Sequence, residues 1–297
     1  MKQIPSAVRA DILGYCMGVR RAVEMAEQAA ADFPQRRVFT LGPLIHNTSA
    51  LASLEKKGVC VLSEDMAHVL EPAAEGAGPV VILRAHGVPP QTKALLAAKG
   101  CTIIDATCPR VLVNQKRAAD FGSKGYTVII AGEKNHGEVT GIAGYCERCV
   151  IVGSAEEAKT LCAGGFCPER AVLISQTTIS RAEYDAISSV LRGSIAQLHV
   201  FDTICPATVQ RQDALLALRG RVDGVLVIGG RHSANTQRLY MTAKECFARA
   251  ALIEQAEEIP REFYALSCVG LTAGASTPDC VIDAVEAALL AGDLQGA

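Results

Sequence analysis

Short apolar runs alternate with longer stretches of helical periodicity along most of the chain. Five runs end in small or polar residues: VVILRAH, TVIIAGE, AVLISQT, GVLVIGG and CVGLTAG. Other segments have helical spacing, as in GVRRAVEMAEQAAADF, where one side carries Val19, Ala22, Val23, Ala26 and Ala30. Such alternation is typical of parallel α/β proteins, so the pattern predicts the α/β fold class.

One arrangement occurs three times when the chain is aligned on Cys16, Cys108 and Cys205. Each cysteine follows a short extended segment with an acidic residue and opens a stretch of helical character. Pro109 and Pro206 suit the first position of a helix, where a missing N–H costs nothing. The repeat predicts three α/β domains of about 100 residues each, with limits at 1–101, 102–198 and 199–297.

Polar residues recur at two places after each of these cysteines, where a strand is expected to end. Those 30 residues later are His46, Glu138 and Asn235, and those 69 to 71 residues later are His86, Thr177 and Ser276. Ligands of parallel α/β proteins bind beyond the carboxyl ends of the strands. Three such edges around one cavity would therefore line it with three thiols and six polar groups.

Composition narrows the class of protein. The 297 residues carry a net charge of −2 with both signs mixed, which gives no basic stripe for nucleic acid or anionic lipid. The first residues lack the apolar core of a signal peptide, and no uncharged stretch reaches membrane-spanning length. A soluble, cytoplasmic protein is expected, whose 12 cysteines are thiols or metal ligands rather than a disulfide framework.

Three cysteines from distant segments would leave a metal position open, which is typical of catalytic rather than structural centres. An iron–sulfur cube held by three thiolates has one iron free for substrate, and that iron could polarise a hydroxyl while the cluster supplies electrons. For any one of these cysteines alone, a buried core thiol is the favoured interpretation. Their common register at helix starts, which stabilises thiolate, favours the ligand interpretation.

The polar positions suit a diphosphate. Histidines, when protonated, are cationic donors, and hydroxyls and amides are neutral donors; these groups are His46, His86, Ser233, Asn235, Thr236 and Ser276. Taken singly, each has an alternative role as a turn, cap or structural residue. Their equivalent places in the repeat favour a binding role.

Glu138 differs because a carboxylate would repel a diphosphate. Its place therefore suggests proton delivery to a leaving hydroxyl, with a solvated loop carboxylate as the alternative. His136 projects from the same face if the segment is extended and could assist the proton transfer. Thr177 could pass a proton or position the hydroxyl.

Nine segments, in order, resemble one family over nearly the full length: GYCMGVRRAV, LIHN, LRAHGV, DATCP, HGEVTG, SQTTIS, TICPAT, RHSANTQRL and VGLTAGASTPD. They are similar to the LytB/IspH family of 4-hydroxy-3-methylbut-2-enyl diphosphate reductases. The resemblance implies a cloverleaf of three similar α/β domains with small parallel sheets around a central 4Fe–4S cluster. It also implies two-electron reductive removal of the C4 hydroxyl, giving isopentenyl and dimethylallyl diphosphates, with ferredoxin or flavodoxin as electron donor.

The matching motifs imply roles for individual residues. The cluster ligands would be Cys16, Cys108 and Cys205, with one iron open, and Glu138 would donate a proton. The residues that would line the substrate pocket are His46, His86, His136, Thr177, Ser233, Asn235 and Ser276.

The chain departs from the family's pattern at three positions. Ala234 replaces a serine, which removes one hydroxyl next to the diphosphate site. Gly137 replaces the usual proline before the glutamate, and Arg110 follows DATCP where an apolar residue is expected. The chemistry is compatible with all three.

Two alternatives have other chemistry. A three-cysteine dehydratase of the quinolinate synthase type would use its cluster as a Lewis acid on carboxylate substrates. A zinc-binding structural module would use Cys146, Cys149, Cys162 and Cys167, whose C-x2-C-x12-C-x4-C spacing is permissible for zinc.

Overall fold

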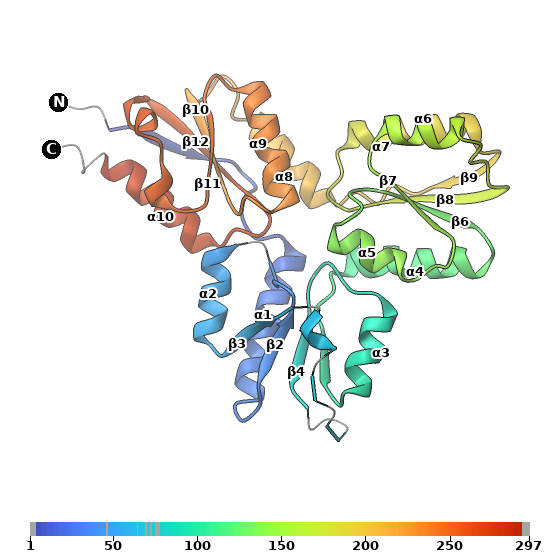
Figure 1. Cartoon of the computed structure of the whole chain (residues 1–297). Coiled ribbons are helices and arrows are strands. Elements are labelled where there is room, and N and C mark those ends of the chain that lie inside the picture. The colour runs from blue at the N-terminus through green and yellow to red at the C-terminus, as the bar shows by residue number, and fades with distance from the viewer. Residues whose placement is uncertain are drawn as a thin grey trace. The chain divides into compact units, whose positions relative to one another are not determined.

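The computed structural model describes residues 4–292 except 46, 64, 69, 72 and 75–77. These residues form three four-stranded sheets in which every pairing is parallel, and helices flank the sheets (Figure 1). The α/β class and the three similar α/β domains are thus confirmed.

The three sheets share one strand order. One sheet runs β3 (Val59–Leu62), β2 (Val38–Leu41), β4 (Val80–Leu83) and β5 (Thr102–Asp105). Another runs β7 (Cys149–Val152), β6 (Thr127–Ala131), β8 (Arg170–Ser175) and β9 (Gln197–Val200). The remaining sheet runs β11 (Ala250–Ile253), β10 (Gly224–Ile228), β12 (Cys268–Ala273) and β1 (Ser6–Arg9).

Helices follow most strands, as parallel pairing requires. The α-helices are α1 (Met17–Asp32), α2 (Thr48–Lys56), α3 (Pro90–Ala98), α4 (Pro109–Ser123), α5 (Gly137–Ala143), α6 (Ala155–Ala163), α7 (Arg181–Ser194), α8 (Pro206–Leu216), α9 (Ala234–Cys246) and α10 (Asp279–Ala291). Short 3-10 turns are η1 (Asp65–Ala67), η2 (Ala256–Glu258) and η3 (Arg261–Ala265).

The five predicted strands are confirmed as β4, β6, β8, β10 and β12. Residues 80–83 and 224–228 are buried at every position. Strands covered by helices on both faces read as continuous apolar runs rather than as an alternation, because neither face meets water. This explains why these central strands could be recognised from sequence.

The strand just before each cysteine lies at the edge of a sheet. Strand β5 pairs with β4, β9 with β8, and β1 with β12. Each sheet therefore takes its edge strand from chain that precedes a repeat's cysteine, and the N-terminal strand completes the C-terminal sheet. The domain limits 1–101, 102–198 and 199–297 stay a prediction. They divide the sequence repeats, whereas β5, which lies in the second range, pairs with β4 of the first, and β9 spans the limit between the second and third ranges.

The second sheet shows how one core is built. Figure 1 shows α6 and α7 on one face of this sheet and α4 and α5 on the other. Ile129, Leu173 and Ile187 belong to the apolar cluster on the first face. Ile130, Val172 and Ile142 belong to the cluster on the second. Two separate apolar layers thus enclose the sheet.

The chain divides into two compact units. One comprises Met1–Arg20, Ile45–Lys56 and Pro206–Ala297, and the other comprises Arg21–Leu44 and Lys57–Cys205. Across the part of the chain that the structure describes, no helix combines the length and apolar character needed to cross a membrane.

Candidate active site

Each of the three aligned cysteines immediately precedes a helix, and its backbone is anchored in the same way. Its N–H donates to a carbonyl in the loop that follows a central strand: Cys16 to Ala275 at 3.1 Å, Cys108 to Ala85 at 2.9 Å and Cys205 to Thr177 at 2.9 Å. The predicted helix starts are confirmed at Met17, Pro109 and Pro206. All three cysteines therefore lie at the carboxyl edge of a sheet and at a helix N-terminus.

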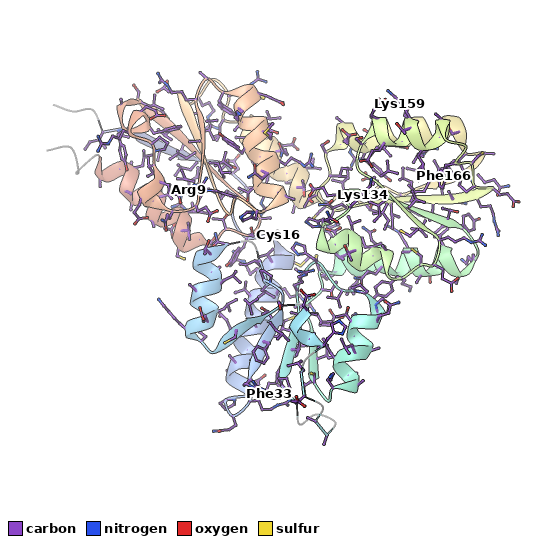
Figure 2. The ribbon with its side chains drawn as sticks, viewed as in Figure 1. Arg9, Cys16, Phe33, Lys134, Lys159 and Phe166 are labelled. Carbon is purple, nitrogen blue, oxygen red and sulfur yellow. The ribbon has the colours of Figure 1, made fainter. Side chains whose placement is uncertain are left out.

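These thiols fit the chemistry of a metal ligand. Cys16, labelled at the start of α1 in Figure 2, is half-buried, as are Cys108 and Cys205, and all three are free thiols. A helix N-terminus stabilises negative charge and so favours the thiolate form that binds iron. Cys108 and Cys205 lie in one compact unit and Cys16 in the other.

Glu138 and Thr177 are joined directly. Glu138 lies in the first turn of α5 and is 1% exposed. Its Oε1 accepts from the Thr177 N–H at 2.7 Å, and its Oε2 accepts from Thr177 Oγ1 at 2.8 Å. The structure thus brings together two predicted site residues that lie 39 positions apart in sequence.

Burial brings the pKa of Glu138 close to neutral pH. Desolvation of the carboxylate raises its pKa from 4.5 to about 7, although the two hydrogen bonds from Thr177 act in the opposite direction. A carboxyl group with a pKa near neutrality can hold a proton and release it at the pH of the cell. The side chain therefore suits an acid catalyst better than a structural anion.

His136 and His86 extend this cluster. His136 caps the N-terminus of α5, where its Nδ1 accepts from the Glu138 N–H at 3.2 Å. With Nδ1 as acceptor, the neutral ring carries its proton on Nε2. The His86 ring lies edge-on to the His136 ring, with centroids 5.1 Å apart. Four predicted site residues thus form one group within a single compact unit.

Glycines on one side of α5 allow this helix to lie close to the loop that carries His86. A Cβ on Gly144 would lie 2.6 Å from Pro89 Cβ, and one on Gly141 would lie 3.2 Å from the carbonyl carbon and oxygen of Gly87. Both distances are shorter than ordinary contacts, so a side chain at either position would push the helix away. The backbone of α5 therefore packs directly on the loop that carries His86.

The departure at Gly137 has a structural counterpart. A Cβ there would lie 2.6 Å from Arg84 Nη2, so the guanidinium of Arg84 occupies the space that a side chain would need. The interpretation of the sequence did not single out Arg84, although it stands in the motif LRAHGV. The sequence signals that could have predicted this contact are the closely spaced glycines of HGEVTGIAG and the arginine of LRAHGV, Arg84.

A second group of predicted residues gathers at the start of α9. The Ser233 hydroxyl oxygen caps this helix by accepting from the Thr236 N–H at 3.4 Å, and Ser276 Oγ donates to Ser233 Oγ at 3.5 Å. Asn235 is 5% exposed, and its Nδ2 has no hydrogen-bond partner among the described residues. A buried amide without a partner is costly unless a ligand or water satisfies it. This helix start therefore fits a bound oxyanion, such as a phosphate oxygen.

Close backbone packing supports the second group. Thr236 is fully buried, and a Cβ on Gly229 would lie 2.8 Å from its Oγ1 and 2.6 Å from Thr277 Oγ1. Gly229 has a φ of +149°, a conformation that favours glycine. The position predicted for His46 lies outside the described residues.

The zinc interpretation is wrong. Cys146 and Cys149 pack with the apolar cluster on the α4 and α5 face of the second sheet, whereas Cys162 packs with the cluster on the α6 and α7 face. One zinc ion needs all its thiolates within about 2.3 Å, which a sheet between them prevents. Among the described residues, no three or more His, Cys, Asp or Glu side chains lie close enough together to hold a single zinc ion.

Comparison with known proteins agrees with the motifs. The model of the LytB protein family matches residues 7–290. The 4-hydroxy-3-methylbut-2-enyl diphosphate reductase of Treponema denticola is 47% identical over 96% of this chain and 99% of its own length. The enzyme of the same name from Treponema pallidum is 46% identical over 96% of this chain and 83% of its own length.

Solved structures share the fold. One is described as (E)-4-hydroxy-3-methyl-but-2-enyl diphosphate reductase, the terminal enzyme of the non-mevalonate pathway; it aligns with a TM-score of 0.71 and 35% identity over 96% of this chain and 99% of its own. The corresponding reductase from Plasmodium falciparum aligns with a TM-score of 0.83 and 25% identity over 94% of this chain and 86% of its own. By matched length, identity and fold, the chain belongs to the LytB protein family.

Proposed function

We propose that this protein is a 4-hydroxy-3-methylbut-2-enyl diphosphate reductase, the terminal enzyme of the non-mevalonate isoprenoid pathway. Relatives that match almost the whole chain carry this name, and the family is the one expected from the motifs. The observation within the site that supports the proposal is the buried Glu138. Its carboxylate accepts two hydrogen bonds from Thr177, and its backbone N–H donates to His136 at the start of α5. It gives the reaction an acid at a helix start.

The reaction replaces the C4 hydroxyl of the allylic diphosphate by hydrogen. Two electrons and two protons enter, the C–O bond breaks, water leaves, and a C–H bond forms to give isopentenyl or dimethylallyl diphosphate. Loss of hydroxide would be slow, so the leaving oxygen has to be protonated. The acid form of Glu138, populated near pH 7, supplies that proton, and the Thr177 hydroxyl orients the carboxyl group.

Cys16, Cys108 and Cys205 are the residues we propose to hold a 4Fe–4S cluster, with one iron left open. All three precede a helix and share the same backbone anchor, as expected for residues with one common role. When bound, the cluster supplies electrons and a Lewis-acidic iron. Ferredoxin or flavodoxin as the electron donor and a cytoplasmic location remain predictions.

The diphosphate is proposed to bind at the helix start that carries Ser233, Asn235 and Ser276. The two hydroxyls and the unpartnered amide of Asn235 are donors, and backbone N–H groups at the start of α9 add positive potential. The missing hydroxyl at Ala234 leaves its backbone N–H in place at the same helix start. His46, His86, His136 and Thr177 are proposed as the remaining pocket residues.

Among the alternatives, the dehydratase of the quinolinate synthase type is disfavoured by the family match over residues 7–290. Its substrates are carboxylates and its reaction needs no electrons, whereas the relatives are named as reductases of a diphosphate.

The test is an assay of protein that is purified and reconstituted without oxygen. With a reduced viologen dye and the allylic diphosphate, we expect isopentenyl and dimethylallyl diphosphates together with dye oxidation. Cys205→Ser should lose iron, visible absorbance and turnover, whereas Cys280→Ser, at an exposed thiol on α10, should keep all three. Full activity in Cys205→Ser, or no product from the parent protein, would overturn the proposal.

A further inference from the structure

Two cysteines outside the proposed site stand next to each other at a turn. Cys146 follows the end of α5, and Cys149 is the first residue of β7. Between them Glu147 and Arg148 form a bend and are exposed, whereas both cysteines are half-buried. Solvent therefore reaches the turn, while the thiols are partly shielded.

Contacts on both sides hold this turn in place. The Cys146 N–H donates to the Ala143 carbonyl at 3.3 Å, and a Cβ on Gly122 of α4 would lie 3.0 Å from Cys146 Cβ. Cys149 pairs in register with Val128 of β6, whose N–H donates to the Arg148 carbonyl at 2.9 Å. Both cysteines are thus fixed by the same helix-and-sheet layer.

The two side chains share one environment. They pack against the same apolar cluster beside Phe121 and Tyr145, and the Cys146 thiol donates to the Ala143 carbonyl at 3.6 Å. The neighbouring Cys149 thiol lowers the pKa of Cys146, although burial acts in the opposite direction, and the pKa of Cys149 is raised by Cys146 and by burial. Cys146 is therefore the more easily deprotonated thiol, and Cys149 the one that stays protonated more readily.

We propose that Cys146 and Cys149 form a dithiol–disulfide pair, which small-molecule disulfides such as oxidised glutathione oxidise and thiols reduce again. The Cys146 thiolate attacks one sulfur of oxidised glutathione, whose S–S bond breaks and releases one glutathione thiolate. Cys149 then loses its proton and attacks the Cys146 sulfur, which releases the second glutathione. Two protein thiols become one disulfide, and one oxidised glutathione becomes two reduced molecules.

Trypsin makes the pair easy to detect. Cleavage after Lys134, Arg148 and Lys159 yields the peptides 135–148 and 149–159, each with one cysteine. The cluster-reconstituted protein is incubated without oxygen in buffers of increasing oxidised-to-reduced glutathione ratio. It is then quenched in acid, alkylated and digested. We expect the two peptides to appear joined, with a loss of two alkylatable thiols, and dithiothreitol should separate them.

Variants identify the attacking sulfur and control for general oxidation. Cys149→Ser should stop at a glutathione adduct on the peptide 135–148, whereas Cys146→Ser should show at least a tenfold slower adduct on its remaining thiol. Cys162 and Cys167 share the peptide 160–170 and report indiscriminate oxidation. The proposal is overturned if 135–148 and 149–159 never join, or join only after 160–170 is oxidised.

Discussion

At the scale of single residues, the acidity of Glu138 decides whether the proposed proton transfer is possible. We expect Glu138→Gln to lower turnover by about 10²–10⁴-fold, because the amide keeps the shape but has no proton to give. Substrate affinity, measured by calorimetry, should change little. Glu133→Gln is the matched control, since its carboxylate is exposed five residues earlier. Unchanged turnover in Glu138→Gln would remove the carboxyl group from the mechanism.

The raised pKa of Glu138 also predicts a pH-dependent stability. The unfolded chain releases this proton near pH 4.5 and the folded chain near pH 7, so between these values unfolding releases a proton and becomes easier as pH rises. The loss of stability is at most about 3 kcal/mol. Thermal midpoints at pH 5 and pH 8 should therefore differ more in the parent protein than in Glu138→Gln. An equal difference would mean that the carboxyl group is not desolvated.

Asn235 offers a third test at this scale. Because its buried amide nitrogen has no partner among the described residues, a bound phosphate oxygen would gain a strong hydrogen bond. Asn235→Ala should raise KM by about tenfold or more, which corresponds to about 1.4 kcal/mol, and should leave the melting temperature unchanged or higher. A drop in melting temperature with unchanged KM would assign the amide a structural role instead.

At the scale of elements, the glycine side of α5 brings the two histidines together. Gly141→Ala should push α5 from the Gly87 backbone, at a cost of about 1–3 kcal/mol, and lower turnover through the displaced Glu138. Gly193→Ala in α7 is the control, because a Cβ there meets nothing within 4 Å and should be neutral or slightly stabilising. The melting temperature and the turnover of both variants are measured. Equal values in Gly141→Ala and Gly193→Ala would mean that the close packing of α5 on Gly87 contributes neither to stability nor to turnover.

At the scale of the whole molecule, each sheet has an apolar core that requires no metal. Leu41, Leu83 and Leu96 lie in one such core, and Leu271 and Val285 lie in another. An iron chelator should therefore abolish visible absorbance and turnover while leaving the far-ultraviolet circular dichroism unchanged. Collapse of the dichroism on chelation would show that the cluster is needed for folding as well as for chemistry.

Much of this molecule follows from local sequence. Central strands such as residues 224–228 are recognisable because both faces are buried, which makes the apolar run continuous. Helix starts after Cys108 and Cys205 follow from the proline that comes next. Spacing from each cysteine singled out Glu138 and Thr177, because equivalent positions recur at equal intervals in a repeat. The strand end expected at Glu138 is wrong, since β6 ends at Ala131 and Glu138 lies in the first turn of α5.

Other features depend on contacts between distant segments. The pairing of β1 with β12 joins the two ends of the chain, and no local pattern encodes a partner 262 residues away (Ser6 to Cys268). The pKa of Glu138 is raised by burial, against the effect of the two hydrogen bonds from Thr177, and the guanidinium of Arg84 lies close to where a Cβ on Gly137 would stand. Sequence determined the residue types and their periodic placement, since these depend on neighbours along the chain. Tertiary structure alone decided burial, pairing and close approach, because these depend on neighbours in space.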